Sequence, residues 1–282
     1  MALLFLRTGA VTLGTTKINF ALPGGASSTP EGGTLAVEFR VKKDLKPEPN
    51  TVELKIWNLA PNTRKALETQ KLIPVQLDVG YGGDNHTIYL GQLRSAQSEI
   101  DGPHIITSIS SGDSEQNLSA NRCLFQIPKA ASPTQILQLA AKAMNVGAGN
   151  LATAAATAST GGPARTYHGN AATVMSQTAR ANGMEWSIQD GAMQLIPIGA
   201  TIGGSGTAVV LSSTSGMIGS PTQDSKGVVT VKSLIQPGLF PGMPVVVQGA
   251  LLQGTYRIET AEFAGATWGA DWTVLLHAKK WK

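Results

Sequence analysis

Residues 52–67, VELKIWNLAPNTRKAL, contain a strand that runs directly into a helix. Val52, Leu54 and Ile56 alternate with charged residues, so they fall on one face of a strand. Pro61 then suits the first position of a helix, where its missing N–H costs nothing. No catalytic motif has this form. We therefore interpret the stretch as a joint within a larger structural unit.

The composition indicates a protein that buries its surface against other subunits. Only 14% of the 282 residues are charged, against about 25% in average soluble proteins, and a surface with few charges suits such contacts. The net charge of +4 is spread evenly, apart from the tail lysines Lys279, Lys280 and Lys282. Without a basic stripe, direct nucleic-acid binding is not expected.

The single cysteine, Cys123, excludes an internal disulfide and any cysteine-based metal cluster, and we expect it to be a small buried residue. The start MALLFLR has too short an apolar run, and no basic region before it, for a signal peptide. No run of about 18 apolar residues is present, so no membrane insertion is expected. We expect synthesis and folding in a reducing cytoplasm.

Residues 1–112 are predicted to form an antiparallel β domain with one short helix at 61–69. The 32 glycines and 15 prolines favour many turns and short strands. The predicted strands lie around Val11–Phe20, Leu35–Lys42, Val52–Leu59, Ile73–Tyr81, His86–Leu90 and Ile105–Ser110.

Residues 113–199 have a different pattern, which predicts a small α+β domain. A helix at 132–144 follows Ser132 as its N-cap, and its apolar residues fall on one face. A second helix at 171–181 follows Asn170 as its N-cap.

Two further segments complete this domain. Residues 147–165 are rich in Ala, Gly, Thr and Ser and almost uncharged, which is typical of a mobile loop. Residues 184–188 and 192–196 form a predicted hairpin around the turn Gln-Asp-Gly.

Residues 200–282 return to β structure. Predicted strands at 228–235, 242–249, 254–264 and 272–281 are separated by Gly and Pro turns. The fold class is therefore mainly β with a small α+β part, in the order β domain, α+β domain, β domain. No short-period sequence repeat relates the two β domains, although a structural duplication could be hidden.

The histidines and acidic residues do not form a recognised catalytic or metal-binding motif. His86, His104, His168 and His277 belong to no G-x-S-x-G elbow or protease context. The sequence has no H-x-x-x-H or C-x-x-C pattern, and Asp84 beside His86 is the closest approach to a ligand pair. We therefore assign no metal-binding, cofactor-binding or catalytic residue.

Two other sets of residues are candidates for a functional site. Glu185 and Asp190 come nearest to the facing carboxylates of a glycosidase, although a hairpin face and its turn explain them more simply. The tryptophans are scattered rather than spaced as a platform for stacking bases, so core or interface positions are expected for Trp57, Trp186, Trp268, Trp272 and Trp281. The sequence therefore predicts a structural protein that is not an enzyme.

The strand followed by W-N-L-x-P-x-T-R at 57–64 resembles a pattern in the N-terminal domains of phage tail proteins of the baseplate hub family. Residues 75–99 and 106–118 resemble the paired strands and the closing turn of that domain. Residues 254–278 resemble the last barrel of these hubs. One departure is Ala60, where the family often has Ser.

The resemblance implies two β-barrels of the tail-tube type, at 1–112 and 200–282, flanking the α+β domain at 113–199. It further implies a homotrimer whose six barrels form a pseudo-sixfold ring in the tail baseplate of the virion. Its implied partners are the tail tube protein, the spike protein, the tape-measure protein and other baseplate proteins, with DNA only in transit.

Two alternative functions remain open from the sequence. One is a tail-associated cell-wall hydrolase, which a zymogram would reveal. The other is a tail protein that binds a receptor or a carbohydrate, which a glycan array would reveal. The sequence does not distinguish a contractile from a non-contractile tail.

Overall fold

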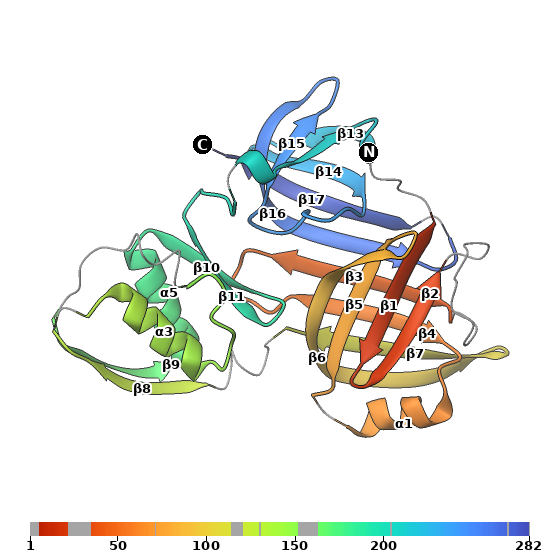
Figure 1. Cartoon of the computed structure of the whole chain (residues 1–282), viewed down its shortest axis with the longest axis horizontal. Helices are drawn as coiled ribbons and strands as arrows, with labels where there is room; N and C mark the ends of the chain where they lie inside the picture. Colours follow the sequence, from red (N-terminus) through yellow and green to blue (C-terminus); the bar gives the residue numbers. More distant parts are fainter. Residues whose placement is uncertain are drawn as a thin grey trace.

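The computed structural model describes residues 6–21, 35–70, 72–113, 121–129, 131–151, 163–203, 205–269 and 271–281. Most of these residues lie in strands, and a small α+β part lies to one side, at the left of Figure 1. The prediction of a mainly β chain with a small α+β part is therefore confirmed.

Thirteen strands form one large sheet, and eleven of them follow one another along a single path that begins with eight strands drawn from both β regions. In spatial order these are β13 (Met217–Gln223), β14 (Val228–Leu234), β17 (Trp272–Lys280), β16 (Gln253–Ala266), β3 (Val37–Asp44), β4 (Thr51–Trp57), β7 (His104–Gly112) and β6 (Asp84–Asp101). Figure 1 shows this order from top to bottom. The path continues through β5 (Pro74–Tyr81), β1 (Arg7–Leu13) and β2 (Thr16–Ala21), while β15 (Pro244–Gln248) branches from β16 and carries β12 (Val209–Ser212).

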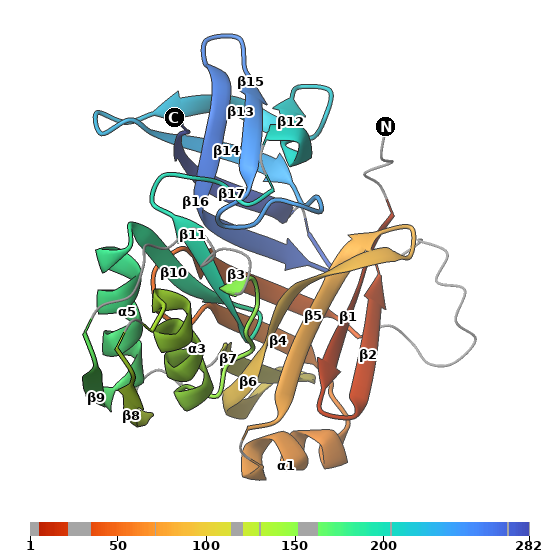
Figure 2. The same cartoon turned by 60° about the vertical axis from the view of Figure 1, so that its left-hand side comes forward.

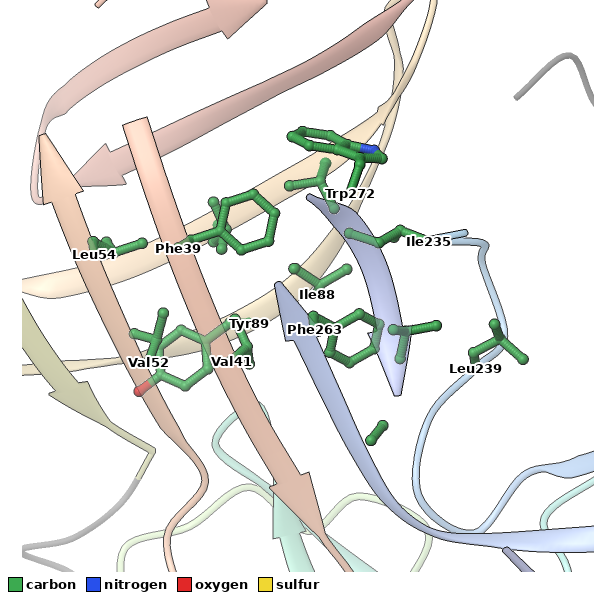
Figure 3. Packing of buried hydrophobic residues seen from close by; sticks show 14 of the residues in the cluster. Phe39, Val41, Val52, Leu54, Ile88, Tyr89, Ile235, Leu239, Phe263 and Trp272 are labelled. Carbon is green, nitrogen blue, oxygen red and sulfur yellow. The ribbon is translucent and has the colours of Figure 1, made fainter. Parts of the chain in front are cut away.

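The two β regions are joined where β16 pairs antiparallel with β3, from Thr260 opposite Asp44 to Ala266 opposite Glu38. They also share one hydrophobic core, in which side chains from β3 and β4 face others from β16 and β17 (Figure 3). The sheet and this core are continuous between the two β regions. The division into domains at 112 and 200 remains a prediction.

An aromatic cluster ties three strands of the two regions together. The ring of Trp272 on β17 lies 5.4 Å from that of Phe39 on β3 and 6.3 Å from that of Phe20 on β2. The contact with Phe39 is edge-on, the geometry that aromatic rings prefer. All three side chains are buried.

The two β regions repeat the same pattern of strand pairing. In the first, β4 pairs with β3 and β7, and the long β6 pairs with β5 through its first half and with β7 through its second. In the second, β14 pairs with β13 and β17. The long β16 pairs with β15 through its first residues and with β17 through most of its length. A register shift interrupts β6 after Leu93 and β16 after Ile258, at the corresponding point.

Individual hydrogen bonds repeat as well. The N–H of Leu93 donates to Ile73, just before β5, and the N–H of Ile258 donates to Met243, just before β15. Strands β5 and β15 each begin with Pro-Val. Strands β13–β17 therefore repeat the arrangement of β3–β7, whereas the outer neighbours differ: β5 pairs with the antiparallel β1 and β15 with the parallel β12.

The joint at 52–67 lies within this repeat. Strand β4 ends at Trp57, Asn58 takes a left-handed backbone conformation with φ of 57°, and α1 (Pro61–Thr69) begins three residues later. Helix α1 buries Leu67. The corresponding connection from β14 to β15 has no helix, so α1 distinguishes the first half from the second.

The α+β part has its own hydrophobic core. Its elements are β8 (Arg122–Ile127), α3 (Pro133–Ala143), β9 (Arg165–Asn170), α5 (Ala171–Ala181), β10 (Met184–Gln189) and β11 (Ala192–Pro197). Ser132 and Asn170 accept the N-cap hydrogen bonds, as predicted. The short 3-10 helix η2 (Ser205–Thr207) follows. Figure 2 shows the hairpin β10–β11 between the two helices and the large sheet.

Several predicted elements differ from the structure. Residues 11–20 form parts of the hairpin β1–β2 rather than one strand, because Gly14 turns the chain with φ of 62°. Strands β8, β9, β12 and β13 were not expected. The start of the predicted mobile loop is fixed, since Leu151 is fully buried and Asn150 hydrogen-bonds the backbone of β11. Residues 152–162 lie outside the described residues, so their mobility remains a prediction.

Candidate functional site

The four histidines are dispersed over the molecule. Nε2 of His86 lies 3.6 Å from Oδ1 of Asp84 in a mainly exposed pair. His104 hydrogen-bonds an asparagine amide and His277 a threonine hydroxyl, while His168 is exposed on β9. Among the described residues, no three His, Cys, Asp or Glu side chains are grouped as they would be around a metal ion.

The cysteine and the tryptophans mostly lie in the core or near it. Cys123 is buried, as are Trp186 and Trp272. Trp268 is 66% exposed and, with the half-buried Trp57, lines a groove of about 620 Å³ beside the end of the β16–β3 pair.

No helix in the described part of the chain has the length and apolar character needed to cross a bilayer.

The carboxylates of Glu185 and Asp190 do not form a catalytic pair. Each binds a different buried cation of the large sheet: Asp190 pairs with Lys43 on β3, and Glu185 pairs with Arg257 on β16. These ion pairs dock the hairpin β10–β11 of the α+β part onto the β body. The site that the structure assembles is therefore a polar junction between two parts of the fold.

The turn of the hairpin positions Asp190. Asp190 and Gly191 have φ of 54° and 77°, the left-handed values of a type I′ turn, which Asp-Gly favours. Both carboxylate oxygens of Asp190 accept hydrogen bonds from Nζ of Lys43, at 2.6 and 2.7 Å. The Lys43 side chain is 0% exposed, and its ammonium also lies 5.0 Å from the centre of the Phe240 ring.

Arg257 holds the other side of the hairpin. Its guanidinium pairs with Glu185 of β10 and with Glu259 of its own strand. It also donates to the backbone oxygen of Ala200, 3.0 Å away. Burial lowers the pKa of Arg257, but the carboxylates of Glu259 and Glu185 together outweigh this effect and raise the pKa. The guanidinium therefore remains charged and links β16 to β10 and to the segment that follows β11.

A buried carboxyl group connects the junction to β4 and β7. Asp113, at the end of β7, accepts hydrogen bonds from the backbone N–H and the side-chain amide of Asn50, at 2.6 and 2.8 Å. The same amide donates to the backbone oxygen of Ile188 on β10. Asp113 is 0% exposed, and this burial raises its pKa to about 7, against the hydrogen bonds from Asn50 and the charge of Lys43.

The sequence contained one signal for this junction. In β3, VEFRVKKD, alternate residues face the core, and this alternation places Lys43 inward with Phe39 and Val41. A lysine at an inward position needs a buried partner. Arg257 and Asp113 carried no comparable signal, because β16 shifts register beside Arg257 and Asp113 follows the end of its strand.

The solvent-facing side of the β16–β3 junction is a balanced charged surface. A groove of about 590 Å³ lies there, lined by three basic and three acidic residues, Arg40, Lys42, Lys232, Glu53, Glu262 and Asp271. Opposite charges face each other across neighbouring strands, as in Lys42 with Glu262 at 3.7 Å. We name the surface made by these six residues the charged face.

No family model and no curated protein sequence matches this chain. Solved structures do match it along almost its whole length. The 43 kDa tail protein of prophage MuSo2 from Shewanella oneidensis superposes with a TM-score of 0.66 at 10% identity, covering 97% of each chain. This chain has a phage tail protein fold.

Two further solved structures match this chain over most of its length. A tail protein from Neisseria meningitidis MC58 has a TM-score of 0.64 at 10% identity and covers 98% of this chain and 97% of its own. The E. coli c3393 protein, a type VI secretion component described as similar to the T4 tail proteins gp27 and gp5, has a TM-score of 0.59 at 10% identity over 90% of this chain and 76% of its own. The resemblance to hub-like tail proteins is thus confirmed at the level of the fold.

Replacing Asp190 with alanine should destabilise the protein by about 3 kcal/mol, because it leaves the ammonium of Lys43 buried without its partner. The double variant Lys43→Met, Asp190→Asn should be much closer to wild type, since it removes the buried charge as well. Urea unfolding of the three proteins measures both effects. Equal losses in the single and double variants would show that the ion pair is not the cause.

The free energy of unfolding should fall as the pH rises from about 4 to about 7. In this window the folded chain keeps a proton on Asp113 that the unfolded chain, with an ordinary pKa of 3.8, has lost. The contribution is at most about 4 kcal/mol, at about 1.4 kcal/mol per pKa unit. Asp113→Asn should remove this pH-dependent contribution. The difference between the unfolding free energies of the two proteins, measured by urea unfolding, should therefore change across this pH range. Parallel pH profiles would contradict the assignment.

Proposed function

We propose that the chain is a structural baseplate hub of a phage tail or a related injection machine. Three copies form a ring that joins the sixfold tail tube on one side to the threefold spike on the other. The observation that carries the proposal is the tail protein fold, shared with two tail proteins over 97% of this chain or more. The role is structural and needs no catalytic residue.

The internal duplication supports a threefold ring with pseudo-sixfold walls. Each chain supplies two halves with the same strand pairing, one built on β3–β7 and the other on β13–β17. Three such chains present six similar units, which a sixfold tube can match, and the threefold symmetry of the chains matches a trimeric spike. A closed ring also satisfies every copy with one type of contact.

The charged face supports the passage of DNA through the ring. A channel wall has to let a polyanion slide without binding it. The three basic and three acidic residues of the charged face give no net attraction for phosphate. We assign this face to the lumen. The proposed partners are the tail tube, spike and tape-measure proteins and other baseplate proteins, and the proposed location is the tail baseplate of the virion.

The copy number in purified tails tests this proposal. Quantitative mass spectrometry, calibrated against a tail protein of known copy number, should find three copies of this chain in each tail. Six or more copies in each tail would overturn the proposed ring, because each chain would then supply one unit of the wall rather than two.

A further inference from the structure

The groove lined by Trp57 and Trp268 is built by both β regions at once. Trp57 is the last residue of β4, and Trp268 lies in the turn between β16 and β17. Thr267 fixes that turn to β3, because its N–H donates to the backbone oxygen of Val37 and its hydroxyl accepts from the N–H of Val37. The groove therefore depends on the pairing of β16 with β3.

The joint after β4 gives the groove a fixed hydrogen-bond donor. Oδ1 of Asn58 accepts from the N–H of Ile105, so the NH₂ of Asn58 faces His104, with Nδ2 3.1 Å from Nδ1 of the ring. An amide nitrogen only donates, so Nδ1 of a neutral His104 accepts and the ring proton lies on Nε2. The imidazole of His104, which lines the groove, therefore has its N–H at Nε2.

Glu38 gives the groove its charge. Among the residues that line the groove, all of which the structure describes, Glu38 is the only one with a formal charge. It is half-buried, and its side chain makes no ion pair or hydrogen bond with another described residue, although Lys55 lies opposite it on β4. This carboxylate repels phosphate, which disfavours a nucleic acid as the ligand, and it attracts a cation.

An arginine side chain is the cation that these residues suit best. Trp is the aromatic residue that attracts cations most strongly, and Trp268 is accessible on the surface. The guanidinium is planar, stacks on aromatic rings and matches a carboxylate with two parallel hydrogen bonds. The groove volume of about 620 Å³ is that of a site for a small ligand, so the side chain and its adjoining backbone both fit.

We propose that this groove binds an arginine side chain from an extended segment of a partner protein. The guanidinium pairs with Glu38 and lies against Trp268 and Trp57. A backbone carbonyl of the same segment accepts from Nε2–H of His104. All the residues of the site come from one chain, so the site itself does not depend on the number of copies in the ring.

The position of the groove indicates a protein as the source of the arginine. Glu38 lies on the same side of β3 as Arg40 and Lys42 of the charged face, so the groove continues that face at the end of the strands. This step rests on the proposed function, which assigns the charged face to the lumen. A groove at one end of the channel is within reach of a protein that abuts or enters the channel there.

Fluorine NMR of a short labelled peptide tests the chemistry with the purified chain. The probe is trifluoroacetyl-Gly-Arg-Gly-amide, whose fluorine signal should broaden on binding, and the matched control peptide carries citrulline, a neutral isostere, in place of arginine. We expect the arginine peptide to bind about tenfold more tightly or better. Equal binding of the citrulline peptide, displacement of the arginine peptide by the neutral sugar chitotriose, or no broadening with the wild-type chain would overturn the proposal.

Two substitutions assign the binding to this groove. Glu38→Gln removes the carboxylate and Trp268→Ala removes the accessible indole, so each should weaken binding of the arginine peptide about tenfold. The matched control is Glu262→Gln, which removes a carboxylate from the same side of the sheet outside the groove and should bind as the wild type does. Equal urea unfolding midpoints show that the fold is intact. Undiminished binding by either groove variant would overturn the site.

A benzophenone amino acid in intact tails tests the partner. Placed at Ala266, which lines the groove, it should cross-link to a segment of another tail protein that contains arginine. Placed at Ala264, two residues earlier on the same side of β16, it should not cross-link to that segment. No cross-link from Ala266, or a cross-linked segment without arginine, would overturn the assignment to a partner protein. The copy number in the tail tests the ring alone, so the two proposals fail separately.

Discussion

The antiparallel pairing of β16 with β3 is the contact on which the rest of the structure depends. It spans seven residue pairs and joins strands more than 200 positions apart in the sequence. It continues the sheet between the two β regions and brings Trp272 against Phe39 and Phe20. Because the first region completes its core with the last strands of the chain, it cannot reach its final packing until those strands are present.

The α+β part is attached to this body by charge rather than by a shared apolar core. Its own hydrophobic cluster is separate, and the hairpin β10–β11 meets the sheet through the ion pairs of Lys43 and Arg257 and the hydrogen bonds of Asn50. Such contacts need close geometry, since a buried charge without its partner is strongly unfavourable. The junction therefore fixes the position of the hairpin more narrowly than an apolar contact would.

Local signals in the sequence were sufficient for the helices and for the most regular strands. Pro61, Ser132 and Asn170 marked where α1, α3 and α5 begin, because caps act within one turn. Strands β3 and β4 were evident from their alternation. Strand β13 was missed, since its Gly-Ser-Pro sequence has low β propensity and pairing imposes its conformation.

The polar junction could not be predicted, and the duplication was implied only by the resemblance to hubs with two similar barrels, because both depend on contacts between distant residues. Few sequence positions match between the halves, and the repeat is visible only in strand order, register shifts and backbone hydrogen bonds. The sequence presents Glu185 and Asp190 as a pair of neighbouring carboxylates, whereas their separate partners lie on β16 and β3.

The central claim is that the two halves of the chain act as equivalent units of one ring wall. A cryo-electron microscopy map of the intact tail, rotated about its axis at the level of this protein, tests it most directly. We predict that the inner wall correlates with itself at 60° nearly as well as at 120°, while the density of the α+β part repeats only at 120°. An inner wall that repeats only at 120°, with one β region outside it, would contradict the claim.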